Sequence, residues 1–383
     1  MKKVKVIILG STGTIGRNTL SIIRHHRKMF KVLALSAYRN ARLLKQQIEE
    51  FRPEYAVLGN RKAGEKFPPA PKKVRILEGE KGINKIASLA SDITVVGISG
   101  LAALKPLVNS LLHAKRVLLA NKEVIVACGH LLRSKFTSLF NKIFPLDSEL
   151  FSLGVILRNI KREELECVYI TASGGPLWGK KQQEMDKVSL QDTLRHPNWK
   201  MGKKISVDSA TLMNKGFEII ETQNIFGLSL DKIKVLVHRQ SFMHALVKMK
   251  SGIILGTMFQ PDMRIPIGYG LGVFSFQEPF FRIKNFPSQL NFVSPDHKRF
   301  PSLPLCLWAA KKGKSLPLVL VSADEAAVEL YLQKKIKLTA IYSLVRETLK
   351  LHRPREVRLW EDVYRIDEWA KKTVLELAER RFS

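Results

Sequence analysis

The sequence predicts an α/β protein: a doubly wound parallel sheet comes first, a second α/β domain follows, and a helical bundle ends the chain. Three observations carry this prediction. Short apolar strands alternate with helical stretches in the first third of the chain. A glycine-rich turn directly follows the first of these strands. From Pro304 onward, apolar residues recur at intervals of three and four, which is the spacing of packed helices.

The first strand and the turn after it indicate a dinucleotide site. Val4–Leu9 is apolar and rich in β-branched residues, and it leads into Gly10-Ser-Thr-Gly13-Thr-Ile-Gly16 and a helical pattern. This order is a variant of the Rossmann-like fingerprint, in which the backbone approaches a pyrophosphate at a helix N-terminus. The glycines alone also fit a plain tight turn, but the strands and helices that follow favour a nucleotide-binding domain.

The same alternation continues along the chain and predicts a parallel sheet. Further strands are expected at Val32–Ser36, Tyr55–Leu58, Ile93–Ile98 and Val117–Ala120, with helices at Ala41–Phe51, Ile83–Leu89 and Leu101–His113. Ligands of such sheets bind beyond the carboxyl ends of the strands, so the residues just after each strand are candidates for binding.

The residues after two of these strands indicate what the site binds. Ser36-Ala-Tyr-Arg39-Asn40 contains no acid for a ribose 2′-hydroxyl, whereas the Arg39 guanidinium suits a 2′-phosphate, so NADP is favoured over NAD. A solvated loop arginine is the alternative. After a later strand, Asn121-Lys-Glu123 offers an amide and a lysine to cofactor and substrate, and the same residues also fit a helix start.

Two carboxylates stand out in this basic chain. Phe144-Pro-Leu146 leads into Asp147-Ser-Glu149, and carboxylates two residues apart point the same way on an extended segment. Hard cations such as Mg²⁺ or Mn²⁺ take a few carboxylates together with substrate oxygens, so this triplet is a candidate metal site. A helix N-terminus with acidic residues in its first turn is the alternative.

A serine-glycine segment follows the next strand. Cys167–Thr171 reads as a strand, and it runs into Ser173-Gly-Gly-Pro176. A hydroxyl and free N–H groups after a strand can form an anion nest, while a plain turn remains the alternative.

Further donors lie downstream in a segment whose apolar residues follow no single period. Ser209, Asn214 and Lys215 offer hydrogen bonds and one charge to a phosphate, and Glu218 offers a third carboxylate to a metal. Glu221 lies one turn further on and is expected to be a solvated partner of nearby lysines.

Composition limits the classes of partner. The formal charge is +30, from 64 Lys+Arg against 34 Asp+Glu, and the basic residues are spread over the whole length. Without a recognition-helix, zinc-finger or RNA-binding signature, an anionic small molecule is favoured over specific nucleic-acid binding. The three distant cysteines predict a reducing compartment. No signal peptide, transit peptide or long apolar run is visible, so a cytoplasmic protein of bacterial type with no membrane span is expected.

Together these segments resemble 1-deoxy-D-xylulose 5-phosphate reductoisomerase, an NADPH-dependent family of non-mevalonate isoprenoid biosynthesis, over nearly the full length. The motifs occur in the right order, and the block from Ser206 to Glu218 is very specific. The matching motifs are the glycine turn, Asn121-Lys-Glu123, Asp147-Ser-Glu149, Ser173-Gly-Gly-Pro176, His196-Pro-Asn-Trp199, Met201-Gly-Lys-Lys-Ile-Ser-Val-Asp-Ser-Ala-Thr211, Met213-Asn-Lys-Gly216 and Pro261-Asp-Met-Arg264.

The resemblance implies an enzyme that rearranges and reduces 1-deoxy-D-xylulose 5-phosphate to 2-C-methyl-D-erythritol 4-phosphate, using NADPH and one divalent ion, Mg²⁺ or Mn²⁺. The implied metal ligands are Asp147, Glu149 and Glu218, and the implied catalytic residues are Lys122, Glu149, His196 and Glu218. Substrate contacts are implied for Lys122, Ser148, Glu149, Ser173, His196, Ser209, Asn214, Lys215 and Glu218, and for Trp199 and Met201 on a closing flap. NADPH contacts are implied for Thr12, Gly13, Thr14, Ile15, Arg39, Asn40, Asn121, Glu123, Gly202 and Met263, and His244 matches a histidine of the family's site.

Four positions depart from the family pattern. Leu150 stands where the family usually has histidine, Tyr38 where glycine is common, Arg239 where it has proline, and Gln260 where it has glutamate. These departures bear on the surroundings of the metal and on the adenosine contacts. They leave open a divergent paralogue, an NADPH-dependent reductase of a related phosphosugar.

The expected domains are an NADPH-binding domain at 1–146, a catalytic domain at 147–272, a linker at 273–299 and a helical domain at 300–383. Helices in the last domain are expected at Leu305–Lys312, Ala323–Gln333, Leu338–Leu351 and Trp360–Arg381. The resemblance implies a homodimer formed through the sheet of the catalytic domain.

Two other classes compete with this reading. A semialdehyde dehydrogenase needs a nucleophilic cysteine, and Cys128 lies in a helical context without the setting of an activated thiol. A nucleic-acid-binding protein is suggested by net charge alone, which predicts only weak, nonspecific binding.

Overall fold

Two compact units make up the chain in this computed structural model, and segments of both alternate along the sequence. The structure describes residues 2–60, 71, 73–199, 201–273 and 286–382. The first unit comprises Met1–Asn121, Phe136–Phe151 and Asp262–Arg282, and the second comprises Lys122–Lys135, Ser152–Pro261 and Ile283–Ser383. The domain boundaries expected from the sequence stay a prediction, and residues 274–285 of the expected linker lie outside the described residues.

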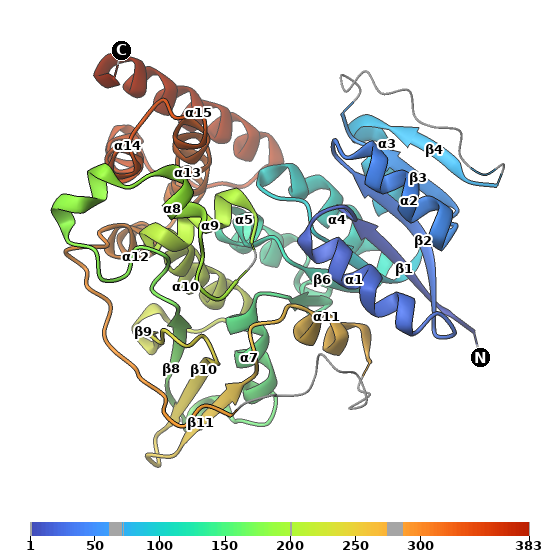
Figure 1. Cartoon of the computed structure of the whole chain (residues 1–383), viewed down its shortest axis with the longest axis horizontal. Coiled ribbons are helices and arrows are strands. Elements are labelled where there is room, and N and C mark those ends of the chain that lie inside the picture. Colours follow the sequence, from blue (N-terminus) through green and yellow to red (C-terminus); the bar gives the residue numbers. More distant parts are fainter. Residues whose placement is uncertain (1, 61–70, 72, 200, 274–285, 383) are drawn as a thin grey trace. The chain divides into compact units, whose positions relative to one another are not determined.

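The first unit is built on a seven-stranded parallel sheet, as the sequence predicts. Its order is β4-β3-β2-β1-β5-β6-β7 (Figure 1). The strands are β1 (Val4–Leu9), β2 (Phe30–Ala37), β3 (Tyr55–Leu58), β4 (Arg75–Glu78), β5 (Ser91–Val96), β6 (Ala114–Leu119) and β7 (Ile143–Pro145). The sequence did not reveal β4 or β7, because β4 is exposed at both ends and β7 is only three residues long.

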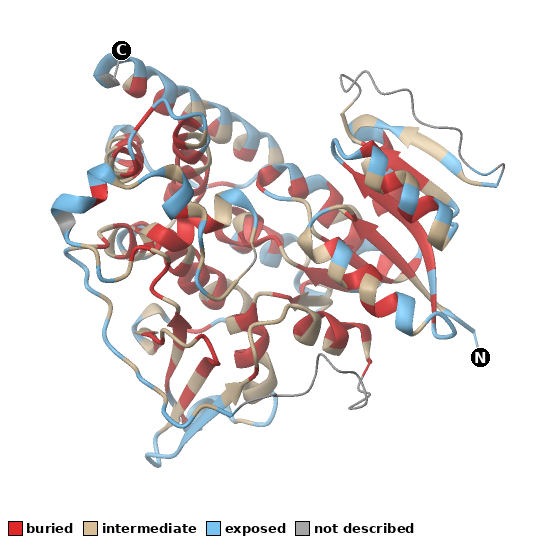
Figure 2. Cartoon of the chain, in the orientation of Figure 1, coloured by how far each residue is buried: buried red, intermediate tan, exposed pale blue. Residues whose placement is uncertain are grey.

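Apolar strands and amphipathic helices enclose the core of this unit. Figure 2 shows the central strands almost entirely buried. The helices are α1 (Thr14–His25), α2 (Ala41–Phe51), α3 (Gly79–Ala87), α4 (Leu104–His113), α6 (Thr137–Phe140) and α11 (Arg264–Leu271). The strand order reverses at β1, which has β2 on one side and β5 on the other. Ligands of doubly wound sheets bind at such a reversal, and the glycine turn leaves β1 there.

The second unit contains a four-stranded mixed sheet in the order β11-β10-β8-β9. The strands are β8 (Leu165–Ala172), β9 (Ile233–Val237), β10 (Met243–Met249) and β11 (Ile254–Met258). β8 runs parallel to β9 and antiparallel to β10, which pairs with β11. A turn containing Gly252, with a φ of 87°, joins β10 to β11 and leaves β11 at the edge of the sheet.

Helices form the rest of the second unit, and the predicted C-terminal bundle is present. They are α5 (Lys122–Lys135), α8 (Leu190–Leu194), α9 (Lys203–Thr211), α10 (Met213–Phe226), α12 (Ser302–Lys312), α13 (Leu316–Leu332), α14 (Leu338–Leu351) and α15 (Trp360–Phe382). Helix α13 is largely apolar and mostly buried because α5, α9, α12, α14 and α15 all pack against it. In the described part of the chain, no helix has the length and apolarity that a membrane span requires.

The expectation that Glu221 is solvated is wrong. Its side chain is buried, with 1% exposure, because α10 packs against both α5 and α12. A helix enclosed on two sides has no solvated face at this position, which the local sequence pattern does not reveal.

A buried ion cluster joins α9 to α13. Lys204 Nζ lies 2.6 Å from Asp208 Oδ2, 2.8 Å from Asp324 Oδ2 and 3.9 Å from Glu123 Oε1. The Asp324 side chain is completely buried and that of Asp208 is 4% exposed. Burial raises the pKa of both aspartates, and repulsion by Asp324 adds to the shift of Asp208, whose pKa rises to about 7. Lys204 is therefore the cation that lets two carboxyl groups occupy the interior.

Lys204→Met should lower the free energy of unfolding by about 3–5 kcal/mol at pH 8, because it removes the cation from a buried cluster. The loss should be smaller at pH 5. A carboxyl group with a raised folded pKa contributes stability below its unfolded pKa, about 4 for Asp, and loses it as pH rises through the folded value. Urea unfolding at both pH values measures this, with Lys203→Met on the exposed neighbour as control. An equal loss at both pH values would contradict the assignment.

Candidate active site

The glycine turn after β1 is shaped for an anion. Gly10 has a φ of 87°, and a Cβ atom on Gly16 would lie 2.4 Å from the Cα atom of Ser11, so neither position tolerates a side chain. Gly13 caps α1 without a side-chain hydrogen bond, which leaves the first turn of the helix suited to a phosphate. Gln47 braces the turn, since its amide accepts from Ser11 Oγ at 2.6 Å and donates to Ser11 O at 2.9 Å.

The structure of the segment after β2 is compatible with both interpretations of Arg39, as a ligand of a 2′-phosphate and as a solvated loop arginine. Arg39 is exposed, and its guanidinium carbon lies 5.2 Å from the ring centroid of Tyr38, which is itself 62% exposed. Asn40 has a structural role as the N-cap of α2, because its Oδ1 accepts from Leu43 N at 3.0 Å. An exposed cation beside an aromatic ring offers a charge and a flat surface to a nucleotide.

The segment after β6 both starts a helix and supplies buried polar groups. Asn121 Nδ2 donates to Ile98 O and Gly100 O, each at 2.9 Å, and so ties the end of β6 to the loop after β5. Lys122 opens α5, is 6% exposed, and its Nζ lies 2.8 Å from the Asn214 amide oxygen and 2.9 Å from Glu218 Oε1. Asn121-Lys-Glu123 therefore forms the start of a helix and also supplies buried polar groups to the candidate site.

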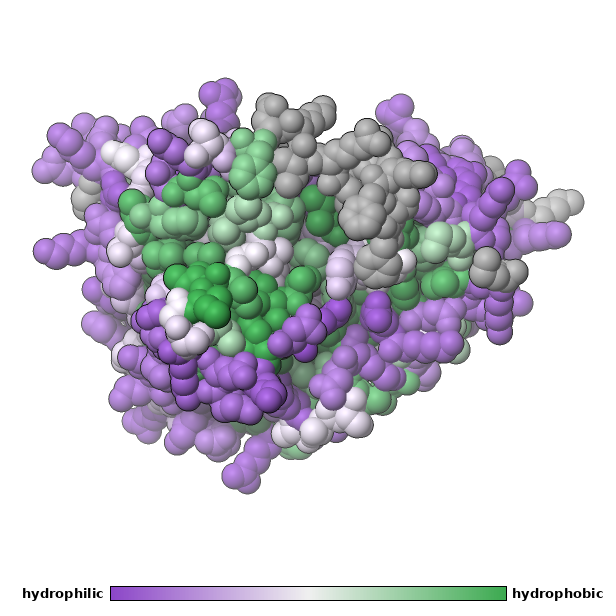
Figure 3. Space-filling model, turned by 90° about the horizontal axis from the view of Figure 1, so that it is seen from below, coloured by the Kyte–Doolittle hydropathy of each residue, from purple (hydrophilic) through white to green (hydrophobic). Residues whose placement is uncertain are grey.

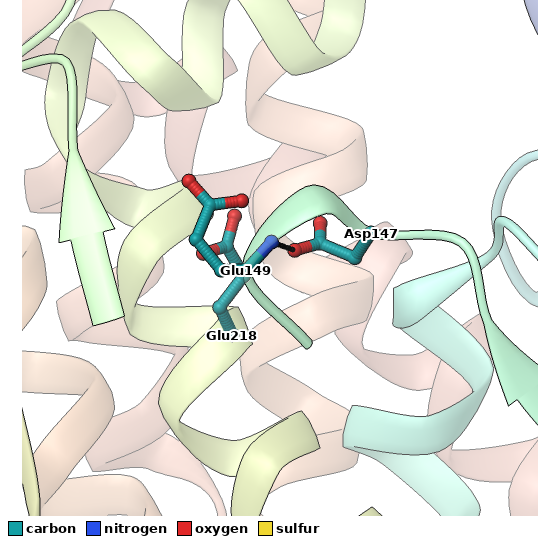
Figure 4. Close-up of side chains that lie close together, drawn as sticks. All are labelled: Asp147, Glu149 and Glu218. Atoms are coloured by element: carbon teal, nitrogen blue, oxygen red, sulfur yellow. Dashed lines mark hydrogen bonds between the residues drawn. The ribbon is translucent and has the colours of Figure 1, made fainter. Parts of the chain in front are cut away.

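The three predicted metal ligands lie together. Asp147, Glu149 and Glu218 each offer a carboxylate oxygen, and these oxygens all lie within 4.8 Å of one another (Figure 4). The expected extended conformation of the acidic triplet is wrong, and the helix-start alternative holds: Ser148 is the first residue of α7 (Ser148–Leu157), and Glu149 lies in its first turn. Glu149 N donates to Asp147 Oδ1 at 3.2 Å, and Ser148 Oγ donates to Glu149 Oε2 at 2.6 Å.

This group of oxygens fits a hard divalent cation. Oxygen ligands about 2.1 Å from an octahedral Mg²⁺ ion lie roughly 3–4 Å from one another, so the separations present need only small side-chain movements. No nitrogen or sulfur ligand belongs to the group, which favours Mg²⁺ or Mn²⁺ over zinc. Glu218 is 1% exposed and paired with both Lys122 and Lys215, so lysines already offset part of the negative charge.

The serine-glycine turn after β8 carries one of the predicted substrate residues, Ser173, and lies beside two others. Gly174 and Gly175 have φ values of 76° and 72°, and a Cβ atom on Gly175 would lie 2.4 Å from Ser209 O, so the turn packs tightly on α9. Ser173 Oγ lies 2.8 Å from His196 Nε2 and accepts from Gly175 N at 3.1 Å. Ser173, His196 and Ser209 are thus brought to one place from three segments.

The joint between α9 and α10 brings the other phosphate candidates to a helix N-terminus. Ser209 lies in the last turn of α9, and Asn214 and Lys215 lie in the first turn of α10. Leu212 between them is buried yet has a left-handed backbone, with a φ of 58°, a conformation that costs a non-glycine residue free energy. No side chain caps α10, so its N-terminal dipole favours an anion here.

One of the predicted flap residues, Trp199, packs beside a buried histidine. The rings of Trp199 and His244 meet edge to face with centroids 6.0 Å apart, and His244 stacks on Phe259 at 3.9 Å. Met201 is half-buried, while Gly202 is exposed at the N-cap of α9.

In the first unit, Ile15 and Met263 both pack against the core of the nucleotide-binding sheet. Asp262 Oδ1 accepts a hydrogen bond from Arg264 N at 2.9 Å. The Pro-Asp-Met-Arg motif therefore forms the start of α11, with Met263 as the N-cap of that helix. The cofactor role of each of these residues stays a prediction.

Comparisons with known proteins agree with this arrangement. A family model described as 1-deoxy-D-xylulose 5-phosphate reductoisomerase matches residues 6–129, and models of the C-terminal domains of that enzyme match residues 143–226 and 258–373. The reductoisomerase of Thermoanaerobacter sp. (strain X514) is 40% identical over 376 residues, which cover 97% of this chain and 98% of the relative. The chain belongs to the 1-deoxy-D-xylulose 5-phosphate reductoisomerase family. The predicted family and enzyme class are confirmed.

Solved reductoisomerase structures confirm the predicted fold class. The enzyme from Zymomonas mobilis in complex with NADPH superposes with a TM-score of 0.90 at 33% identity, covering 99% of this chain and 100% of that one. A reductoisomerase in complex with NADPH, fosmidomycin and magnesium gives a TM-score of 0.86 at 30% identity, covering 98% of each chain.

Two departures from the reductoisomerase pattern have a visible structural setting. Leu150 is completely buried on α7, where a histidine would need hydrogen-bond partners. Arg239 donates through Nη1 to Ser173 O at 2.6 Å and to Gly175 O at 2.8 Å. Arg239 therefore contacts the same turn as the predicted substrate residues, which the sequence pattern alone did not indicate.

Other supporting residues were also missed in the sequence. Gln47 lies on the apolar face of α2 beside Leu44 and Ile48, and Asp324 lies in the apolar helix α13. A single polar residue on an otherwise buried helix face is a signal that could have identified both.

Arg39→Ala should raise the KM for NADPH about 10- to 100-fold and leave the KM for NADH within about 3-fold, because only NADPH carries the 2′-phosphate that a guanidinium binds. Initial rates with each dinucleotide measure the effect. Arg42→Ala, which removes an exposed arginine three residues further along, is the matched control. An unchanged KM for NADPH in Arg39→Ala would assign Arg39 to the solvated alternative.

Proposed function

We propose that this chain converts 1-deoxy-D-xylulose 5-phosphate to 2-C-methyl-D-erythritol 4-phosphate, with NADPH as the hydride donor and one Mg²⁺ or Mn²⁺ ion at Asp147, Glu149 and Glu218. The observation that carries the metal assignment is the convergence of three carboxylate oxygens within 4.8 Å in a member of this family. A reductoisomerase solved with NADPH, fosmidomycin and magnesium supports the same cofactors.

The metal and its neighbours would stabilise developing charge. When bound, the cation supplies Lewis acidity toward the substrate oxygens during rearrangement of the carbon skeleton. Lys122 is fixed by Asn214 and Glu218, so its ammonium group is oriented before substrate binds. Ser148 and His196 are the further candidates for contacts with the sugar backbone.

The substrate phosphate would bind across the serine-glycine turn and the α9–α10 joint. Ser173 and Ser209 supply hydroxyl groups, Asn214 supplies an amide, and Lys215 supplies the charge at the N-terminus of α10. Binding energy from this remote group would orient the reacting carbons and favour closure of the flap. Trp199 and Met201, on that flap, would exclude water from the aldehyde formed before reduction.

NADPH would bind along the carboxyl end of the parallel sheet. Its pyrophosphate fits the first turn of α1, and its 2′-phosphate fits Arg39. The remaining proposed contacts are Thr12, Gly13, Thr14, Ile15, Asn40, Asn121, Glu123, Gly202 and Met263.

NADPH absorbance should fall when 1-deoxy-D-xylulose 5-phosphate and Mg²⁺ or Mn²⁺ are added, and the product should be 2-C-methyl-D-erythritol 4-phosphate.

Glu218→Gln should lower turnover by at least about 10³-fold while NADPH binding stays near wild type, because one metal ligand loses its charge. Glu166→Gln, on the exposed face of β8, is the control.

Wild-type turnover in Glu218→Gln would contradict the metal assignment. Folded wild-type protein that oxidises no NADPH with this substrate would contradict the proposed reaction. Oxidation with a related phosphosugar alone would support the divergent paralogue.

The edge strand of the second sheet supports a homodimer. β11 is hydrogen-bonded to β10 on one side, and at its start Ile253, Ile254 and Leu255 are 59%, 56% and 41% exposed. Figure 3 shows apolar side chains gathered on one face of the molecule. An apolar edge strand is a ready site for pairing with a second copy of the same strand.

The double variant Ile253→Glu/Leu255→Glu should convert a dimer to a monomer at micromolar concentration, because it puts four like charges into a two-fold interface. Sedimentation equilibrium measures the mass. Leu375→Glu, on the exposed face of α15, is the matched control. A variant with the same mass as wild type would exclude this edge as the interface.

A further inference from the structure

The proton on His196 can be assigned from its hydrogen bonds. Its Nδ1 atom faces the backbone N–H groups of Trp199, at 3.0 Å, and Asn198, at 3.3 Å. Both of these groups can only donate, so Nδ1 must be an unprotonated acceptor. A neutral imidazole with a free Nδ1 carries its proton on Nε2, and Nε2 therefore donates to Ser173 Oγ at 2.8 Å.

This assignment fixes the role of the Ser173 hydroxyl. Its oxygen accepts from His196 Nε2 and from Gly175 N, so both acceptor positions are used. The hydroxyl proton is then left to donate away from these two partners. A hydroxyl whose proton is directed in this way is suited to a ligand that only accepts hydrogen bonds, such as a phosphate oxygen.

Arg239 contacts both parts of this arrangement. Its guanidinium binds the carbonyl oxygens of Ser173 and Gly175, which lie on either side of the left-handed Gly174. Its own carbonyl accepts from Asn198 Nδ2 at 2.7 Å, and the same amide donates to Ser241 Oγ at 2.8 Å. Arg239 thus contacts the serine-glycine turn through its side chain and, through its backbone, Asn198, the residue before Trp199.

We propose that Arg239 is a positioning residue for phosphate recognition: it holds the Ser173–Gly175 turn and, with the backbone N–H groups at Nδ1, keeps His196 as a neutral donor to Ser173. The inference rests on the proposed function, since it deepens the phosphate site of that reaction. It gives His196 the role of orienting a hydroxyl group, in place of the sugar contact considered above, and not that of a proton carrier.

Charge and burial, like these hydrogen bonds, favour the neutral form of the His196 ring. Burial, and then the positive charge of Arg239, lower the pKa of His196 from its usual 6.5 to about 4. Protonation would also place an N–H group against the two backbone donors at Nδ1. His196 should therefore remain neutral from pH 8 down to about pH 5.

The test uses inorganic phosphate as the probe and compares Arg239→Met with Arg239→Lys. Arg239→Met should weaken phosphate binding about 10-fold, because the turn loses two charge-assisted hydrogen bonds. Arg239→Lys should stay within about 3-fold of wild type, since an ammonium group can still reach a carbonyl. Lys234→Met, which removes an exposed charge from β9, controls for net charge. Calorimetry measures phosphate binding without turnover. In steady-state assays, Arg239→Met should raise the KM for the sugar phosphate with little change in the KM for NADPH.

Nitrogen-15 NMR of the His196 ring supplies a measurement that needs no variant. Wild-type protein should show a protonated Nε2 and an unprotonated Nδ1 between pH 5 and 8, and Arg239→Met should show a higher pKa for the ring. A protonated Nδ1 in wild type, or phosphate binding by Arg239→Met equal to that of the Lys234→Met control, would overturn the proposal. Wild-type protein that binds phosphate but oxidises no NADPH would instead refute the proposed reaction.

Discussion

Negative charge held in a buried site is the constraint on which the rest of the second unit depends. Glu218 is almost fully buried, and its carboxylate is one of three that converge. Each ionised carboxylate in a low-dielectric interior requires a nearby cation or several donors. Lys122 and Lys215 meet that requirement at Glu218, and both lysines are themselves buried. Helices α5 and α10 must therefore stay packed together for the site to exist.

The same rule applies a second time in the interior of this unit. Lys204 compensates Asp208 and Asp324, and its pair with Asp324 joins α9 to α13, one of the helices of the C-terminal bundle. Helix α9, which carries Ser209 of the proposed phosphate site, is thus attached to α13 by the ion pair between Lys204 and Asp324. The C-terminal helices contribute to the site through this link, although none of the predicted site residues belongs to them.

Local sequence pattern was sufficient for much of the fold. Apolar, β-branched runs fix strands such as Val4–Leu9, whose bounds agree with the structure. Carboxylate chemistry made Asp147, Glu149 and Glu218 metal candidates, and the family resemblance joined them into one set, whose oxygens lie close together. The local sequence pattern failed where contacts between distant segments determine the partners or the burial of a residue. Arg239 looked like a departure in a loop because its partners at Ser173 and Gly175 are more than sixty residues away. Glu221 looked solvated because nothing local shows that two helices cover α10.

The alternation of the two units along the sequence has a consequence for how the protein is made. The core of the nucleotide-binding sheet includes Ile267, Leu271 and Val273, which pack in the same cluster as Val6 and Ile8. A ribosome must therefore synthesise all four strands of the second unit's sheet before the first unit can complete its interior. The amino-terminal strands alone would expose an apolar face that α11 later covers, and such long-range closure slows folding. A fragment that ends after β7 would lack part of its own core.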